Sequence, residues 1–314
     1  MPASAPSSAR YIDPAVLMRI RSLELRVKAV MEGFVTGLHR SPFHGFSVEF
    51  TEYRQYTNGD DPRFLDWKVV ARSDRYYIKR FEDETNLRCH LLVDNSRSMS
   101  YGSGGYSKTD YAKTLAACVA YSLIQQRDAC GLVLFDERVD DFLPARFRHG
   151  QLRQILVSLE RAAGGQSTNL IEPLERVAAQ VRKRGLVILI SDLLAPTEGL
   201  ERALGSLAAC GHKLAVFQTL DPREIDFQFT DTALFIDAES GRELYVDPDA
   251  IRSTYQQRLG AHLAEIKSVC EKLGATYQLV PTDRPLEIVL AEFLMASQQA
   301  KSRTRQRSSA GGKK

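Results

Sequence analysis

The chain reads Leu91-Leu92-Val93-Asp94-Asn95-Ser96-Arg97-Ser98 within its first third. The apolar run followed by an Asp-x-Ser-x-Ser cluster predicts a buried strand that ends in a tight turn. Oxygen groups that alternate on such a turn can face one point in space, and hard oxygen ligands suit Mg²⁺, Mn²⁺ or Ca²⁺ rather than Zn²⁺. We therefore expect a divalent metal site at the end of this strand, to which other parts of the chain add ligands.

From about residue 87 onward, short β-rich runs alternate with longer amphipathic segments. The pattern predicts strands at 87–94, 129–135, 185–190, 213–220 and 276–280, with a hairpin partner at 138–143. It predicts helices at 107–126, 151–161, 171–184, 197–210, 251–273 and 285–297. Nearly continuous apolar strands that alternate with helices predict an α/β fold, in which a doubly wound, mostly parallel sheet carries helices on both faces.

Further candidate ligands come from two other predicted loops. In doubly wound sheets, ligands bind beyond the carboxyl ends of the strands; Asp94 and Asp192 both follow predicted strands, and Thr168 lies in the glycine-rich segment 164–170. We expect Ser96, Ser98 and Thr168 to be hydroxyl ligands, with Asp94 and Asp192 binding the ion directly or through water. Mg²⁺ usually keeps some water, so a coordination position is left for an external ligand.

A purely structural interpretation of the same cluster stays open. Asp94 can form an Asx turn, and the two serines can cap the chain that follows. The metal interpretation is favoured because three separate oxygen-bearing positions fall at predicted strand ends or in a glycine-rich loop.

The first 85 or so residues lack the alternating pattern. Residues 14–31 read as an amphipathic helix, and residues 43–81 are dense in aromatic side chains and in charges of both signs. We interpret residues 13–85 as a smaller module, helical at first and then β-rich. Its charged and aromatic side chains form either an ion-pair network that fixes the module or a partner-binding face, and the first is favoured because buried charges need partners. They are Arg54, Tyr56, Asp60, Asp61, Arg63, Asp66, Trp67 and Arg72.

Lys108 and Asp110 follow a glycine-rich loop just past the metal motif. Lys108 either pairs with an acid beside the site, or touches an anionic ligand, or is an ordinary solvated residue at a helix start. Asp110 is favourable in the first turn of a helix. We treat both residues as candidate supporting residues of the metal site.

The composition indicates a globular protein and limits its class. The chain has 314 residues, of which 44% are hydrophobic and 26% charged, and no apolar run approaches the ~20 residues of a membrane-spanning helix. Residues 1–12 are expected to be disordered and carry no secretory signal. The five cysteines show no Cys-x-x-Cys spacing, so we expect buried free thiols and a reducing, cytoplasmic location.

The net charge of +3 conceals two unlike parts of the chain. Residues 297–314 hold six basic residues and no acid, which leaves 3 − 6 = −3 for the body at 1–296. The tail is expected to be a disordered, solvated end rather than a specific nucleic-acid contact, because no aromatic residues are interleaved to stack on bases. The main domain is then expected at 86–296.

A family resemblance adds to these expectations. The set Asp94, Ser96, Ser98, Thr168 and Asp192 resembles the metal-ion-dependent adhesion site of von Willebrand factor A domains. Together with the string from Arg54 to Arg72, it resembles the bacterial domain-of-unknown-function family fifty-eight, a von Willebrand factor A relative, over roughly residues 40–295. The resemblance implies a Mg²⁺-binding interaction domain that works with a MoxR-type AAA+ ATPase in assembling or maturing other proteins.

Three functions compete at this point. The favoured one is a non-catalytic binding module whose metal is completed by a carboxylate of a partner protein. A metal-dependent hydrolase or phosphatase is less favoured, because an aspartyl-phosphate enzyme needs a carboxylate two residues after the nucleophile and this chain has Ser96 there. Weak nucleic-acid binding through the basic tail is the third.

Overall fold

The computed structural model describes residues 11–40, 53–55, 77–79, 87–161, 170–229, 233–236 and 242–296. The chain forms two compact units: Met1–Arg40 with Leu87–Lys314, and Ser41–Asn86. Within the second unit, β1 (Tyr53–Gln55) pairs antiparallel with β2 (Tyr77–Lys79), and Arg54 lies opposite Ile78.

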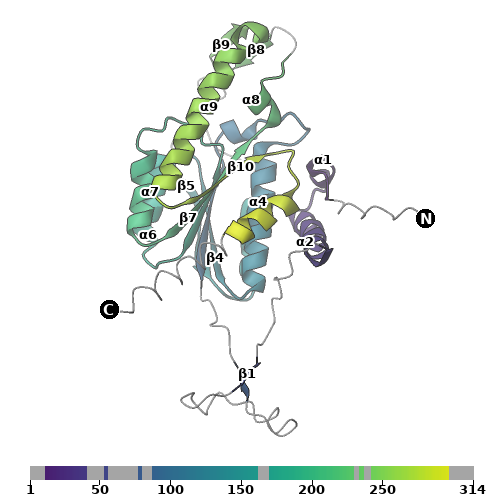
Figure 1. Ribbon diagram of the computed structural model, residues 1–314, viewed down its shortest axis with the longest axis vertical. Coiled ribbons are helices and arrows are strands. Elements are labelled where there is room, and N and C mark those ends of the chain that lie inside the picture. Colours follow the sequence, from purple (N-terminus) through teal and green to yellow (C-terminus); the bar gives the residue numbers. More distant parts are fainter. Residues whose placement is uncertain are drawn as a thin grey trace, which may run out of the picture. The chain divides into compact units, whose positions relative to one another are not determined.

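Six strands form the central sheet in the order β10-β7-β6-β3-β4-β5 (Figure 1). Neighbouring strands are parallel except for β5, which pairs antiparallel with β4. The strand β5 is the hairpin partner that the sequence predicted at 138–143. The prediction of a doubly wound, mostly parallel sheet is therefore confirmed. The strands are β3 (Arg88–Asp94), β4 (Ala129–Phe135), β5 (Val139–Arg146), β6 (Leu186–Ser191), β7 (Lys213–Leu220) and β10 (Thr276–Pro281).

Helices cover both faces of this sheet because each central strand is apolar on both sides. Leu91 and Val93 of β3 belong to one buried cluster, whereas Leu92 between them belongs to the other, which is the period-two alternation of a strand. The first cluster packs against α1 (Pro14–Leu17), α2 (Leu23–Arg40), α4 (Lys108–Gln125), α5 (Gln151–Leu159) and the helical residues 286–296. The second packs against α6 (Ile171–Gln180), α7 (Leu200–Ala209) and α9 (Pro248–Lys272). Figure 1 shows α4 on one side of the sheet and α6 and α7 on the other.

The N-terminal helices belong to the main unit, which differs from the expected module at 13–85. Val27 and Val30 of α2 are buried in the same cluster as Leu115 of α4. The amphipathic face of α2 is thus covered by the sheet domain, so a boundary near residue 41 describes the chain better than one near residue 13. The helix predicted at 14–31 is also two helices, with a break between Leu17 and Leu23.

A short insertion after β7 was missed by the sequence pattern. It consists of α8 (Pro222–Asp226) and an antiparallel pair formed by β8 (Ala233–Ile236) and β9 (Glu243–Val246). Phe227 stacks on Phe235 with 5.8 Å between ring centroids and lies 4.3 Å from the ring of Tyr255 in α9. These tertiary ring contacts stabilise elements that are too short for a periodic signal.

The cysteines follow the expectation with one exception. Cys89, Cys118, Cys130 and Cys270 are buried free thiols, which confirms the prediction for them. Cys210 is free but exposed, because it follows the last turn of α7 at the surface.

Candidate metal centre

The ends of β3 and β6 lie at the topological switch point of the sheet. The chain first adds β4 and β5 on one side of β3, and then adds β6, β7 and β10 on the other side. Relative to chain order the six strands run 3-2-1-4-5-6, and β3 and β6 are the first and fourth of them. Ligands in such sheets bind at this switch point, beyond the carboxyl ends of the strands. Asp94 is the last residue of β3, and Asp192 directly follows β6.

Asp94 is completely buried and held from two directions. The backbone N–H of Ser96 donates to Asp94 Oδ1 at 2.9 Å, and the hydroxyl of Ser191 donates to Oδ2 at 2.5 Å. The first contact is the Asx turn of the structural interpretation. It leaves the metal interpretation open, because each carboxylate oxygen accepts more than one contact.

The two serines of the motif lie side by side. Ser96 Oγ and Ser98 Oγ are 3.0 Å apart, at the start of the 3₁₀-helix η2 (Ser98–Ser100). Neighbouring ligands of an octahedral Mg²⁺ with bonds of roughly 2.0–2.1 Å are separated by about 2.9 Å. The spacing of the hydroxyls therefore fits a pair of adjacent Mg²⁺ ligands.

Asp192 is positioned by a turn in a costly conformation. Leu193, which follows it, is buried and has a φ of 53°, a left-handed value that is unfavourable for a non-glycine residue. Its N–H donates to Ser191 Oγ at 3.0 Å, and Gln218 Nε2 donates to the carbonyl of Asp192 at 2.8 Å. These bonds fix the backbone on both sides of the Asp192 carboxylate.

A buried lysine joins this carboxylate to the insertion after β7. Lys108 Nζ lies 2.9 Å from Asp192 Oδ2 and 2.6 Å from Glu224 Oε1. Glu224 is held in place because its other oxygen accepts from the backbone N–H of Asp221 at 2.8 Å, within a capping box at the start of α8. Of the interpretations given for Lys108, pairing with an acid beside the site describes its position.

Asp110 has a different part in the structure. Ser107 donates to its carboxylate through both the backbone N–H, at 3.0 Å, and the hydroxyl, at 2.8 Å. The backbone N–H of Asp110 donates in turn to Ser107 Oγ. Asp110 therefore closes the capping box that begins α4, and this helix start presents Lys108 to the site.

Burial, more than the charges of the site, raises the pKa of Asp94. Burial and then the neighbouring charge of Asp192 raise it from 3.8 to about 6, against the hydrogen bonds from Ser191 and Ser96. Burial lowers the pKa of Lys108, but the charges of Asp192 and Glu224 outweigh it and the net pKa is raised. The ionised form of Asp94 is therefore disfavoured by burial and by the charge of Asp192.

The donor set fits a divalent cation. Asp94, Asp192 and Glu224 with Lys108 carry a formal charge of −3 + 1 = −2 when all are ionised, a charge that one divalent ion balances. The candidate ligands are oxygens only, as Mg²⁺ prefers. Among the residues that the structure describes, no three His, Cys, Asp or Glu side chains cluster as a metal site, so the hydroxyls of Ser96 and Ser98 are needed to complete one.

Several residues expected at the site or near it lie outside the described ranges. They are Thr168, Tyr56, Asp60, Asp61, Arg63, Asp66, Trp67 and Arg72, and of Arg54 only the backbone is described. Two residues that contribute to the site were missed by the sequence analysis, namely Ser191 and Glu224. The polar end of an otherwise apolar strand was the only signal for Ser191.

The fold and the site together define the class. An α/β domain with this strand order and an Asp-x-Ser-x-Ser turn at its switch point is a von Willebrand factor A-like domain. Residues 52–265 match the family described as "Protein of unknown function DUF58", and the chain belongs to this family.

Relatives extend over most of the chain. Uncharacterized proteins of Mycobacterium bovis and Mycobacterium tuberculosis are each 30% identical over 278 residues, which are 87% of this chain and 86% of theirs.

Solved structures with similar arrangements share little sequence. The conserved hypothetical protein BatB from Bacteroides thetaiotaomicron has a TM-score of 0.45 at 17% identity and covers 68% of this chain and 99% of its own. The SpRpn10 VWA domain has a TM-score of 0.38 at 10% identity, covering 66% of this chain and 94% of its own. An aerotolerance-related membrane protein from Bacteroides fragilis matches at a TM-score of 0.45 and 15% identity, over 66% of this chain and 97% of its own. Among the described residues of the present chain, no helix is both long and apolar enough to cross a membrane.

Proposed function

We propose that this chain is a metal-dependent protein-interaction module. Asp94, Ser96, Ser98 and Asp192 would hold Mg²⁺, or Mn²⁺ or Ca²⁺ in its place, together with Thr168. A carboxylate of the partner protein would complete the coordination. The observation that carries the proposal is the convergence of two buried carboxylates and a close hydroxyl pair at the switch point of the sheet.

The bound ion would supply a positive charge that the partner's carboxylate neutralises. The residues of the chain do the rest. Ser191 and the N–H of Ser96 orient Asp94, while Lys108 holds one oxygen of Asp192. Because these contacts are buried, the carboxylates are oriented before any partner arrives.

The family resemblance points to the partner. It implies that a MoxR-type AAA+ ATPase, or a client of that ATPase, supplies the carboxylate, and that the chain acts as an adaptor in protein assembly or maturation. A cytoplasmic location is proposed with it, which the free thiols support because persistent disulfides are rare there.

The competing functions have less support. Ser96, hydrogen-bonded to Ser98, stands where an aspartyl-phosphate hydrolase needs its second carboxylate. Turnover of a phosphoester that is lost in Asp94→Asn would nevertheless establish the hydrolase. Nucleic-acid binding rests on the tail at 297–314, which lies outside the described residues.

Metal binding is tested first, on the purified full chain. Calorimetric titration with Mg²⁺ and Mn²⁺ is expected to show one saturable site in the wild type. In Ser98→Ala the affinity of this site for the metal is expected to be at least about tenfold weaker, because a ligand is lost. Ser206→Ala is the matched control, since that hydroxyl bonds only to a carbonyl of its own helix, at 2.9 Å. Equal affinities in the wild type and Ser98→Ala would exclude the proposed ligand set.

Partner capture is tested separately. A MoxR-type ATPase encoded beside this chain is immobilised, and capture of the wild type is compared in Mg²⁺ and in EDTA. Capture is expected only with Mg²⁺, and to be lost in Asp94→Asn but kept in Asp249→Asn, a change at an exposed carboxylate on α9. Capture that is indifferent to EDTA would contradict the metal-dependent mechanism.

A further inference from the structure

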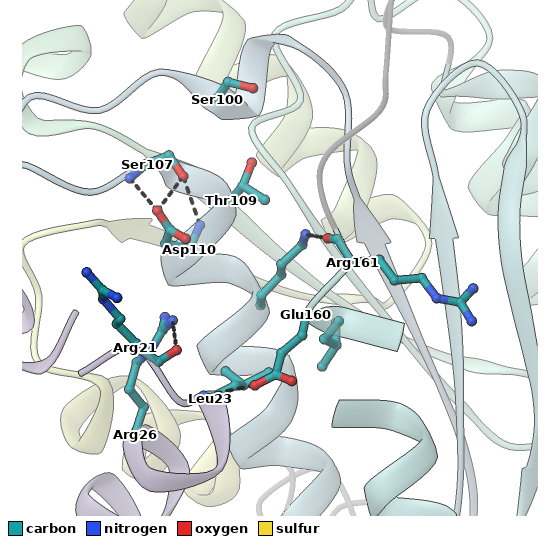
Figure 2. Close-up of a pocket in the computed structure, with 11 residues that line it drawn as sticks. Arg21, Leu23, Arg26, Ser100, Ser107, Thr109, Asp110, Glu160 and Arg161 are labelled. Atoms are coloured by element: carbon teal, nitrogen blue, oxygen red, sulfur yellow. Dashed lines mark hydrogen bonds between the residues drawn. The ribbon is translucent and has the colours of Figure 1, made fainter. Parts of the chain in front are cut away.

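A second polar pocket lies on the side of α4 that carries Asp110 and Lys113, next to the candidate metal centre. It has a volume of about 450 Å³, within the range of small-molecule sites. Its wall includes Ser100, which ends the same 3₁₀-helix that begins with Ser98 of the metal motif. In Figure 2, Arg21 and Arg26 come from the N-terminal helical region, Ser107, Thr109 and Asp110 from the start of α4, and Glu160 and Arg161 from the end of α5.

Lys113 brings a nearly buried ammonium group into this pocket. Lys113 is only 9% exposed, and its Nζ donates to the carbonyl of Arg161 at 2.7 Å. This contact uses one of its three donors. Among the described residues, no carboxylate forms an ion pair with Lys113. Burial lowers the pKa of Lys113, and the charge of Asp110 offsets this only in part.

Arg26 presents a second under-used cation. One terminal nitrogen of its guanidinium donates to Thr114 Oγ1 at 3.0 Å and to Met18 Sδ at 3.3 Å, and the other donates to the carbonyl of Arg21 at 3.4 Å. Its Nε is buried and has no hydrogen-bond partner among the described residues. A buried, unsatisfied donor on a charged group is costly, so a small shift of the Arg26 side chain that brings Nε against a ligand oxygen would be stabilising.

Two acids of the pocket accept hydrogen bonds from the chain, and their charges also act on Arg26, whose pKa burial nevertheless lowers. Glu160 Oε1 accepts from the backbone N–H of Leu23 at 3.2 Å, and Asp110 is bonded to Ser107 within the capping box. The guanidinium of Arg161 pairs with Asp141 at 3.1 Å, and Figure 2 shows its side chain extending away from the other labelled residues. Arg21, Arg26 and Lys113 against Asp110 and Glu160 leave an excess of 3 − 2 = 1 positive charge.

We propose that this pocket binds the phosphate group of a small molecule. The pocket offers the unused donors of Arg26 and Lys113, the exposed Arg21 and the hydroxyl of Ser100. These donors are more than the two oxygens of a carboxylate require, whereas a phosphate has three strong acceptor oxygens. The site is independent of the metal ligands and does not rest on the proposed function.

Inorganic phosphate is the probe, added to the full chain and measured by thermal unfolding and calorimetry, with sodium chloride at matched ionic strength and acetate as controls. The wild type is expected to show saturable stabilisation by phosphate that neither control reproduces. No saturable response to phosphate, or an equal response to chloride, overturns the proposal. A response to acetate as strong as that to phosphate overturns the preference for phosphate.

Variants locate the site. Lys113→Met is expected to raise the Kd for phosphate at least about tenfold, and Arg21→Gln about threefold to tenfold, since each removes a charge-assisted hydrogen bond. Lys28→Gln, at an exposed side chain of α2 outside this pocket, is expected to leave it unchanged. If Lys113→Met fails to fold, Arg21→Gln tests the proposal alone, because Arg21 is exposed. A Kd for phosphate in Arg21→Gln equal to that of the wild type then overturns the assignment of phosphate to this pocket. Asp94→Asn is expected to keep phosphate binding, which separates this test from that of the metal centre.

Discussion

Lys108 Nζ and Asp192 Oδ2 lie 2.9 Å apart, and both side chains are completely shielded from solvent. The chain thus carries a permanent cation next to its candidate metal ligands. Lys108→Met would leave Asp192 and Glu224 buried without their partner, so we expect the free energy of unfolding without metal to fall by about 3–5 kcal/mol. Mg²⁺ is expected to recover part of this loss, because a second cation then compensates Asp192.

Chemical denaturation with and without Mg²⁺ measures both effects. Lys267→Met is the matched control, since Lys267 forms an exposed pair with Glu271 at 3.9 Å and such pairs contribute ~0–1 kcal/mol. If the two variants lose the same stability, the buried pair has no special energetic role.

The raised pKa of Asp94 predicts an unusual dependence of stability on pH. Because the pKa is raised from 3.8 to about 6, the folded state holds a proton that the unfolded state releases between these values. The stabilisation from protonated Asp94 is complete below pH 3.8 and is lost as the pH rises through about 6. At pH 7.5 without metal, Asp94→Asn is therefore expected to be more stable than the wild type, by about 3 kcal/mol at most.

Thermal unfolding from pH 4 to 8 in EDTA tests this sign. Addition of Mg²⁺ is expected to reverse the order at pH 7.5, since only the wild type gains a bound ion. A less stable Asp94→Asn throughout this range would show that hydrogen bonding outweighs the burial of charge.

Gly131 in β4 provides a test of the edge of the sheet. A Cβ at this position would lie 2.6 Å from both Ala145 N and Leu143 O of β5, where the pairing shifts register. Gly131→Ala is expected to lower the free energy of unfolding by roughly 1–3 kcal/mol through this overlap. Gly260→Ala, in an open position on α9, is expected to raise it by up to about 1 kcal/mol through helix propensity. Opposite signs in denaturant titration are the predicted result, and a neutral or stabilising Gly131→Ala would contradict the close approach of β5.

The placement of α2 on the sheet domain is tested by two valines of the same helix. Val30 is fully buried in the core, whereas Val35 is 49% exposed. Val30→Ala is expected to cost about 2 kcal/mol through a cavity and lost burial, and Val35→Ala less than about 0.5 kcal/mol. Similar values in denaturant titration would place α2 outside the cooperative core.

Where side chains pack on both faces of the sheet, the sequence predicted the structure closely. The strands at 129–135 and 213–220 have the predicted bounds. A continuous apolar run flanked by polar residues fixes both ends of a buried strand. The insertion at 222–246 gave no periodic signal, since its stability comes from ring contacts such as Phe227 with Tyr255.

At the candidate site, the sequence did not predict the contacts between residues that are far apart in the chain. Asp94 and Asp192 were found because each follows an apolar strand. The bond from Ser191 to Asp94 joins residues 97 positions apart, and Lys108 reaches Glu224 over 116 positions. No local spacing contains such pairs, so the supporting contacts needed the three-dimensional structure.

The pairing of β3 with β6 has a consequence for biosynthesis. Residues 89–93 find their parallel partners only at 186–190, so the central pair of the sheet cannot close until residue 190 has left the ribosome. Until then one side of β3 keeps an open edge, and unpaired apolar edges are prone to aggregate during slow, non-local folding. We therefore expect the nascent chain to be most prone to aggregation during the synthesis of the segment between these two strands.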